Sequence, residues 1–354
     1  MDSPMANLGN SLLVPSVHEL AKQPLTKVPE RYLRLNQQPV ISDTKSLPQL
    51  PVIHMNKLLS GDEAELHNLN QACKHWGFFQ LINHGVNPSL VQNVKMGVTE
   101  FFGLPMEEKN KLWQKQGELE GYGQNFVTSD EQKLEWADLF YIHTLPSYTR
   151  NPHVFANIPQ PFRNDIESYS LELEKLCFTI IKLMTKALKI KPEDQFLKLF
   201  EDLSQSMRMN CYPPCPQPEH VIGLNPHSDA GALTILLQVN EMEGLQIKKD
   251  GMWIPIKPLS NAFVINVGDI MEILTNGIYE SIEHRATINS EERISIATFH
   301  RPQMNKMIGP TPSLVSPERP AMFKNIVVAD YYRQYFSREL QGKKCLDVIR
   351  TTKA

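Results

Sequence analysis

Residues 244–258, GLQIKKDGMWIPIKP, carry the clearest structural signal in the chain. Apolar and polar residues alternate on either side of Asp250-Gly251, a pair that favours the tight turns with positive φ found in β-hairpins. Further segments with strand character are AFVINVGDIMEILTN (262–276), SIEHRATIN (281–289) and RISIATFH (293–300). Many short strands in one half of a chain indicate a double-sheet jelly roll.

The first half of the chain has helical periodicity instead. Apolar residues recur at helical spacing near residues 62–77 and, most strongly, over residues 161–190. We therefore expect a mixed α/β fold, with a double-stranded β-helix (a cupin-like jelly roll) as the core and supporting N-terminal helices. Residues 1–160 are expected to form a region of helices and strands that packs on the core, residues 161–342 a helix plus the jelly-roll core, and residues 343–354 a C-terminal tail.

Composition limits the partners and the compartment that we expect. The 354 residues carry a formal net charge of -3, with 41% hydrophobic and 21% charged residues. Without a basic face, neither nucleic acid nor anionic lipid is expected as the main partner, and no run of about 18 apolar residues predicts a membrane span. The five cysteines are too few and too scattered for a disulfide framework. We expect a monomer in a reducing compartment, the cytoplasm.

A metal-capable pair lies beside an apolar segment in NPHSDAGALTILLQ (225–238). If the strand includes His227 and Asp229, these two residues point to the same face, because side chains alternate along a strand. His284 follows in SIEHRA, and antiparallel strands can bring it back to the pair. Two imidazoles and one carboxylate on one face of a metal are diagnostic of non-haem Fe(II) oxygenases.

Each of these residues also has a simpler interpretation. His-x-Asp occurs by chance, and a lone histidine such as His284 is usually a surface or core residue. A second constellation strengthens the metal hypothesis, because ERISIATF (292–299) places Arg293 and Ser295 on one strand face. Arginine grips a carboxylate with two parallel hydrogen bonds, and a nearby hydroxyl can donate to the same group. The alternative is a surface arginine on an edge strand.

These motifs, together with RMNCYPPCPQP (208–218) and HWGFFQLINHG (75–85), resemble the plant 2-oxoglutarate- and Fe(II)-dependent dioxygenase family. The likeness extends from about Leu50 to Gly342. The N-terminal segment and the run EGYGQNFVTSDEQKLEWADLFY (120–141) are most similar to the subgroup that contains the codeine and thebaine O-demethylases and the senescence-related oxygenases.

The resemblance implies roles for individual residues. The residues implied to bind Fe(II) are His227, Asp229 and His284. Those implied to hold the cosubstrate 2-oxoglutarate are Arg293, Ser295, Asn210 and Tyr212. Cys211 stands where the family motif Asn-Tyr-Tyr-Pro-Pro-Cys has its first tyrosine, a departure that leaves the two cosubstrate positions beside it intact.

The resemblance also implies a reaction class. A plant specialised metabolite, such as an alkaloid, a coumarin or a flavonoid, would be hydroxylated or O-demethylated by dioxygen, with release of succinate and CO2 and with ascorbate as the reductant. The residues that we expect to line the pocket for this organic substrate are Phe299, Phe126, Phe140 and Tyr141.

Other functions stay open from the residues alone. A metal hydrolase on a cupin-like fold could use the same three ligands, although it needs no grip on a dicarboxylate. An inactive oxygenase scaffold could act as a small-molecule binding or regulatory protein, although intact ligands argue against this. Cys211 and Cys215 could suggest a further metal site, but no second cysteine pair completes four ligands, so we expect them to be packing residues.

Overall fold

Two β-sheets form the centre of the computed structural model, which describes residues 11–34, 48–337 and 342–351. The strands of the larger sheet are β1 (Val52–His54), β2 (Phe78–Ile82), β3 (Gly121–Gly123), β4 (Asp138–Leu145), β5 (Ser204–Tyr212), β7 (Leu233–Gln238), β10 (Phe263–Val267) and β12 (Arg293–Arg301). Those of the smaller sheet are β6 (Leu224–His227), β8 (Leu245–Lys249), β9 (Met252–Pro255) and β11 (His284–Ala286).

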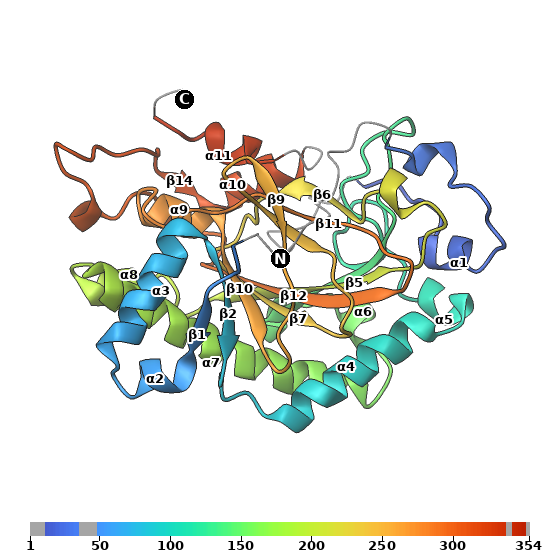
Figure 1. Cartoon of the computed structure of the whole chain (residues 1–354), viewed down its shortest axis with the longest axis horizontal. Coiled ribbons are helices and arrows are strands. Elements are labelled where there is room, and N and C mark those ends of the chain that lie inside the picture. The colour runs from blue at the N-terminus through green and yellow to red at the C-terminus, as the bar shows by residue number, and fades with distance from the viewer. Residues whose placement is uncertain (1–10, 35–47, 338–341, 352–354) are drawn as a thin grey trace.

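The strand order identifies the jelly roll. It is β1-β2-β10-β7-β12-β5-β4-β3 in the larger sheet and β6-β11-β8-β9 in the smaller one, so the central strands of the larger sheet, from β2 to β5, have neighbours that are distant in sequence. Residues of both sheets line the same internal cavity, and Figure 1 shows the smaller sheet on one side of the larger. The predicted mixed α/β fold with a jelly-roll core is confirmed.

The predicted hairpin at residues 244–258 is also confirmed. β8 and β9 pair antiparallel, with Lys249 opposite Met252. Asp250 and Gly251 have φ angles of 50° and 79°, as a type I′ turn requires at both of its central positions. On its other side β8 pairs with β11, so the hairpin helps to fix the strand that begins at His284.

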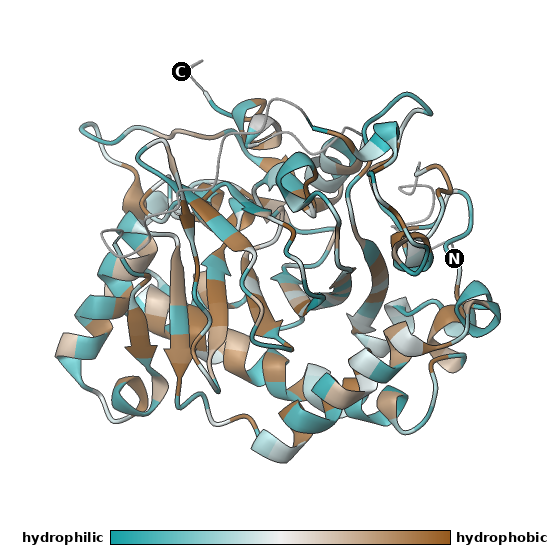
Figure 2. Ribbon diagram, turned by 45° about the vertical axis from the view of Figure 1, so that its right-hand side comes forward, coloured by the Kyte–Doolittle hydropathy of each residue, from teal (hydrophilic) through white to brown (hydrophobic). Residues whose placement is uncertain are grey.

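Three helices cover the outer face of the larger sheet, and Figure 1 shows them along one side of it: α3 (Glu63–His75), α4 (Pro88–Gly103) and α7 (Phe162–Leu188). α7 buries a stripe that includes Leu173, Ile180 and Met184, as its helical spacing predicts. In Figure 2 the strands are largely hydrophobic, and the helices mix hydrophobic and hydrophilic residues. The side chain of Asp62 caps α3 and that of Asn87 caps α4.

The remaining α-helices and strands are short. They are α1 (Val17–Ala21), α2 (Met55–Leu59), α5 (Met106–Asn110), α6 (Pro152–Ala156), α8 (Glu193–Leu197), α9 (Asp269–Leu274), α10 (Val328–Phe336), α11 (Lys344–Asp347), β13 (Met307–Ile308) and β14 (Ile326–Val327). Within the described ranges, no helix is both long enough and apolar enough to cross a membrane.

The N-terminal region does more than pack on the core. Strands β1 to β4 extend both edges of the larger sheet, and β4 pairs with β5 over a long ladder from Asp138↔Cys211 to Leu145↔Gln205. Backbone hydrogen bonds therefore connect residues on the two sides of position 160. The three-part division of the chain stays a prediction.

One predicted strand is wrong in its second half. β10 ends at Val267, and residues 269–274 form helix α9. The backbone N–H groups of Asp269 and Ile270 donate to the carbonyl oxygens of Asp229 and Gly231, which turns the chain out of the sheet. All six residues of α9 are buried, and a short buried helix and a buried strand both produce a continuous apolar run.

Candidate active site

The two predicted histidine ligands are held opposite each other by the smaller sheet. His227 is the last residue of β6, His284 is the first residue of β11, and the ladder pairs them directly. Asp229 lies in the loop after β6 and not on a strand, so strand alternation was the wrong reason for placing it beside His227. We call His227, Asp229 and His284 the triad; their ligand atoms lie within 4.8 Å of one another.

Backbone hydrogen bonds orient both imidazole rings. Nδ1 of His227 lies 2.8 Å from the carbonyl oxygen of Asn225, and Nδ1 of His284 lies 3.0 Å from that of Ile282. Each Nδ1 must carry the proton, since a carbonyl oxygen can only accept. Both Nε2 lone pairs are thus left free, and they lie 3.5 and 3.6 Å from Oδ1 of Asp229. This is the tautomer that a metal-binding histidine needs.

The carboxylate of Asp229 is fixed on its other side. Its Oδ2 accepts hydrogen bonds of 2.7 Å from the Thr234 hydroxyl and the Asn266 amide. Burial alone would raise the pKa of Asp229, but His284 and His227 lower it below its usual range. Burial, together with the neighbouring His227, lowers the pKa of His284 to about 4. An anionic carboxylate and a neutral imidazole are the ligand forms that a divalent ion takes.

The predicted cosubstrate residues line one cavity with the triad. Arg293 and Ser295 of β12 lie opposite Tyr212 and Asn210 of β5 in the ladder, and all four line that cavity. Arg293 is buried and its Nη2 donates to the Gln238 amide oxygen over 2.9 Å. Among the residues that the structure describes, its Nε has no hydrogen-bond partner. An unsatisfied N–H of a buried guanidinium beside a metal-capable triad fits the carboxylate of a bound acid.

A second, aromatic cavity reaches the triad from the other side. Three of the residues expected to line the substrate pocket, Phe299, Phe126 and Tyr141, line this cavity, and so do His227 and Asp229. The residues of α10 that sequence reasoning missed are Tyr332, Tyr335 and Phe336. Phe336 stacks on Phe126, with ring centroids 5.3 Å apart and an interplanar angle of 8°. The aromatic density of DYYRQYF (330–336) was the available signal.

The prediction for Phe140 is wrong. Adjacent residues of a strand point to opposite faces, and Tyr141 takes the face of β4 that meets the aromatic cavity. Phe140 therefore points into the helix-covered core, where its ring centroid lies 4.6 Å from that of Phe101. It has no exposed surface and lines neither cavity.

Comparison with known proteins identifies the family. Residues 203–302 match the 2OG-Fe(II) oxygenase superfamily, and residues 50–160 match the family described as non-haem dioxygenase in morphine synthesis, N-terminal. The oxoglutarate-dependent flavonoid 7-O-demethylase 1 of Ocimum basilicum is 52% identical over 349 residues, which is 97% of this chain and 92% of the relative. The chain belongs to the 2OG-Fe(II) oxygenase superfamily.

Other relatives support the same family assignment. Thebaine 6-O-demethylase of Papaver somniferum is 49% identical over 98% of both chains. The crystal structure of JOX2 in complex with 2OG, Fe and JA matches with a TM-score of 0.86 at 34% identity, covering 96% of this chain and 98% of JOX2. The protein is thus a dioxygenase that depends on Fe(II) and 2-oxoglutarate. The hydrolase and inactive-scaffold alternatives are not favoured.

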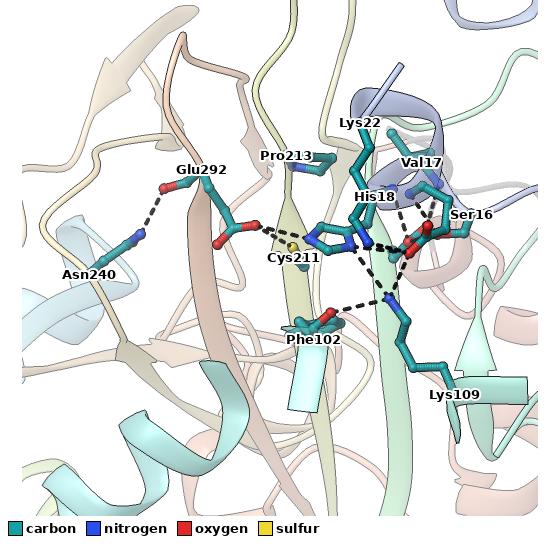
Figure 3. A network of polar contacts seen from close by, with 12 residues as sticks. Ser16, Val17, His18, Lys22, Phe102, Lys109, Cys211, Pro213, Asn240 and Glu292 are labelled. Atoms are coloured by element: carbon teal, nitrogen blue, oxygen red, sulfur yellow. Dashed lines mark hydrogen bonds and ion pairs between the residues drawn. The ribbon is translucent and has the colours of Figure 1, made fainter. Parts of the chain in front are cut away.

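The oxygenase has a second group of metal-capable side chains. His18 of α1, Cys211 of β5 and Glu292, which we call the His18 cluster, also have ligand atoms within 4.8 Å of one another. Sγ of Cys211 lies 3.3 Å from Oε2 of Glu292, and Nε2 of His18 lies 3.6 Å from the same oxygen. Figure 3 shows the His18 ring between these two residues and the ammonium group of Lys109.

Lys109 disfavours a metal in the His18 cluster. Its Nζ lies 3.4 Å from Nδ1 of His18, and an ammonium group can only donate, so Nδ1 must be the unprotonated nitrogen. The proton is then on Nε2, the atom that faces Cys211 and Glu292. Metal binding there would move this proton to Nδ1, against the ammonium group. Burial, with Glu292 nearby, also raises the pKa of the Cys211 thiol, so we assign this cluster to packing.

Proposed function

We propose that this oxygenase hydroxylates or O-demethylates a flat aromatic plant metabolite, such as a flavonoid, a coumarin or an alkaloid. The observation that carries the proposal is the aromatic cavity, because it opens directly on His227 and Asp229. Flat rings stack on aromatic side chains, and the named relatives include a flavonoid demethylase and a thebaine demethylase.

The triad would hold Fe(II). Its two imidazoles and one carboxylate occupy one face of the ion and leave the opposite positions for other ligands. Bound iron, with 2-oxoglutarate and dioxygen, supplies the oxidising power, while the cosubstrate leaves as succinate and CO2. Thr234 and Asn266, through Oδ2 of Asp229, hold the other carboxylate oxygen toward the metal position.

Arg293 would bind the far carboxylate of 2-oxoglutarate. Its Nε, which has no partner, and its Nη groups form the planar fork that matches a carboxylate. The Ser295 hydroxyl would donate to the same group, and Asn210 and Tyr212 would contact the cosubstrate from β5. The protein's task is placement, because a misplaced substrate loses most of the benefit of a preassembled site.

The aromatic cavity must open to admit such a substrate. Its volume is about 50 Å³, whereas sites for drug-sized ligands measure roughly 300–1000 Å³. The stack of Phe126 on Phe336 closes one wall. Phe126 also has a φ of 65°, a conformation that is uncommon for a bulky residue. We propose that these two rings part when the substrate enters, while Phe299 forms the wall nearest the metal.

The test is a substrate screen with two readouts. Methoxylated flavonoids, coumarins and alkaloids would be incubated with Fe(II), 2-oxoglutarate, ascorbate and air, while succinate is measured and products are analysed by mass. The expected product has gained one oxygen atom or lost one methyl group as formaldehyde. Phe299→Ala should keep substrate-independent succinate formation and weaken the binding of the organic substrate by about 1–3 kcal/mol. Product formation without consumption of 2-oxoglutarate would contradict the proposal.

We also propose that the enzyme acts as a cytoplasmic monomer with small-molecule partners. Every residue assigned above comes from one chain. Cys73, Cys177, Cys211 and Cys215 are buried thiols outside any disulfide, which suits a reducing compartment. The net charge of -3 gives no reason to expect nucleic acid as a partner.

A further inference from the structure

Arg208 occupies the junction between the two cavities. The residues that line both of them are Arg208, His227, Asp229 and Phe299. Arg208 lies on β5, one alternating position before Asn210, so both side chains point into the space between the sheets. Its side chain is only 9% exposed. A fixed positive charge is therefore enclosed next to the metal position, on the side where the organic substrate would lie.

The hydrogen bonds of this guanidinium are incomplete. Nε donates to Oδ1 of Asn210 over 2.7 Å. Nη2 lies 3.9 Å from Oε2 of Glu135, too far for a hydrogen bond, and the other oxygen of Glu135 accepts from the backbone N–H of Asn225 over 2.8 Å. Within the described part of the chain, neither Nη group makes a hydrogen bond. Glu135 thus balances part of the charge but leaves these N–H groups without an acceptor.

A ligand oxygen would complete this group. Neither Nη atom is among the fully buried polar atoms without a partner, so both keep some accessible surface on a residue that lines the two cavities. A charged N–H group there gains from an acceptor. The other polar residues that line the aromatic cavity, apart from the triad, are Asn125, Tyr141, Ser206, Tyr332 and Tyr335. Arg208 is the cation among the described residues of this lining, and a divalent ion bound to the triad would add to its positive field.

We propose that Arg208 determines substrate specificity by binding an acidic oxygen, a phenolate or a carboxylate, of the organic substrate. The proposal rests on the proposed function, because it assumes that the substrate enters the aromatic cavity. It narrows the substrate class, since the same field disfavours a protonated amine. An acidic phenol or an aromatic acid is therefore expected to bind in preference to a basic alkaloid, with the adjoining ring held between the aromatic walls.

Three probes that share a methoxystyryl group and differ in their polar end test this inference. They are 4-methoxycinnamic acid, its primary amide and 4-methoxycinnamylamine, each titrated calorimetrically into the enzyme with Fe(II) and 2-oxoglutarate in the absence of dioxygen. A charge-assisted hydrogen bond should make the acid bind about ten- to a hundredfold more tightly than the amide, with the amine weakest. Arg208→Met should abolish the preference for the acid, whereas Arg208→Lys should keep part of it.

A second buried arginine provides the matched control. Arg301 of β12 is also buried, its guanidinium lies 4.9 Å from the ring centroid of Tyr332, and it lines neither cavity. Arg301→Met should keep the order acid, amide, amine. Loss of the order in both variants would indicate a general change of the fold and would overturn the assignment, as would an unchanged order in a folded Arg208→Met protein. Thermal unfolding of each variant shows whether it is folded.

Titration of 2-oxoglutarate separates the remaining outcomes. Arg208 also lines the cosubstrate cavity, so Arg208→Met could instead weaken the binding of 2-oxoglutarate. Weaker cosubstrate binding with an unchanged order of probes would make Arg208 a cosubstrate residue and overturn the proposal. Failure of the proposed function would give a different result. The parent enzyme would then form no succinate from 2-oxoglutarate, whatever the order in which the probes bind.

Discussion

The triad and the His18 cluster contain similar donors within the same reach, yet the groups behind those donors suit a metal in the triad and disfavour one in the His18 cluster. In the triad, backbone carbonyl oxygens hold the proton of both histidines on Nδ1 and free both Nε2 atoms. In the His18 cluster, Lys109 occupies the position that those carbonyl oxygens have in the triad, and it forces the opposite tautomer. The distance between donors is therefore a weak criterion, and the groups behind the donors decide the chemistry.

Two residues of the His18 cluster are sequence neighbours of residues that line the cosubstrate cavity. Cys211 belongs to the His18 cluster, whereas Asn210 and Tyr212 on either side of it line the cosubstrate cavity. Glu292 belongs to the His18 cluster and the next residue, Arg293, to the cavity. Alternation along β5 separates an active face from a structural one, so substitutions of neighbouring residues should have very different effects.

The largest expected effect is loss of the metal in Asp229→Ala. Loss of a hydrogen-bond partner behind a ligand typically lowers metal affinity by about 10–100-fold. Removal of one of the three ligands themselves should lower the affinity for Fe(II) by more than this, and succinate formation should stop. Iron content after desalting and succinate release measure the two effects. Glu292→Ala, which removes the carboxylate of the His18 cluster, should keep the iron content of the parent. Undiminished turnover of Asp229→Ala at ordinary iron concentration would refute the triad.

Arg293→Lys should have the next largest effect. Lysine offers a point charge in place of a planar fork, so the apparent requirement for 2-oxoglutarate should rise by about one to two orders of magnitude while iron stays bound. The neighbouring Glu292→Gln is the control, because it changes the preceding residue without touching the cavity. Cosubstrate titration of both variants gives the answer, and an unchanged requirement in Arg293→Lys would mean that the dicarboxylate binds elsewhere.

Motifs located the site in the sequence better than periodicity did. Residue types and their order singled out the triad, Arg293 and Ser295, and the structure brings these residues together around one cavity. The pairing of His227 with His284 was not predicted, because ladder register depends on turns and on the neighbouring strand β8. Phe140 and Tyr141 were both assigned to the pocket, although adjacent strand residues must diverge. Alternation does not say which of the two faces the cavity.

Tertiary contacts explain the other errors. The apolar run at residues 269–274 is a buried helix because its first N–H groups bond to the loop that carries Asp229. Tyr335 and Phe336 reach the cavity from far along the chain, where the Tyr335 hydroxyl donates to the carbonyl oxygen of Ser228, between two residues of the triad. No local pattern encodes such an approach, so only the aromatic density of α10 could have suggested it.

A smaller effect concerns pH in the metal-free protein. The pKa of His284 is lowered to about 4 by burial and by His227, whereas an unfolded chain takes up this proton near its usual pKa of about 6.5. Between these values the unfolded state binds more protons, so the free energy of unfolding should fall, by about 2–3 kcal/mol, as pH drops from 6.5 to 4. Denaturant titrations at several pH values measure the slope. His284→Gln should flatten it, and an equal slope in that variant would assign the effect to other groups.

The smallest effect is expected for Cys211→Ser, and it tests the comparison most directly. A serine hydroxyl can replace the thiol as donor to Oε2 of Glu292, so the free energy of unfolding should change by about 1 kcal/mol or less. Serine is, however, a poor ligand for soft divalent ions, which prefer thiolate. If the His18 cluster has only a packing role, parent and variant will both bind one Zn²⁺ in competition with Fe(II), at the triad. A second bound Zn²⁺ in the parent that disappears in Cys211→Ser would show that Lys109 does not exclude a metal, and the distinction drawn between the two groups would fail.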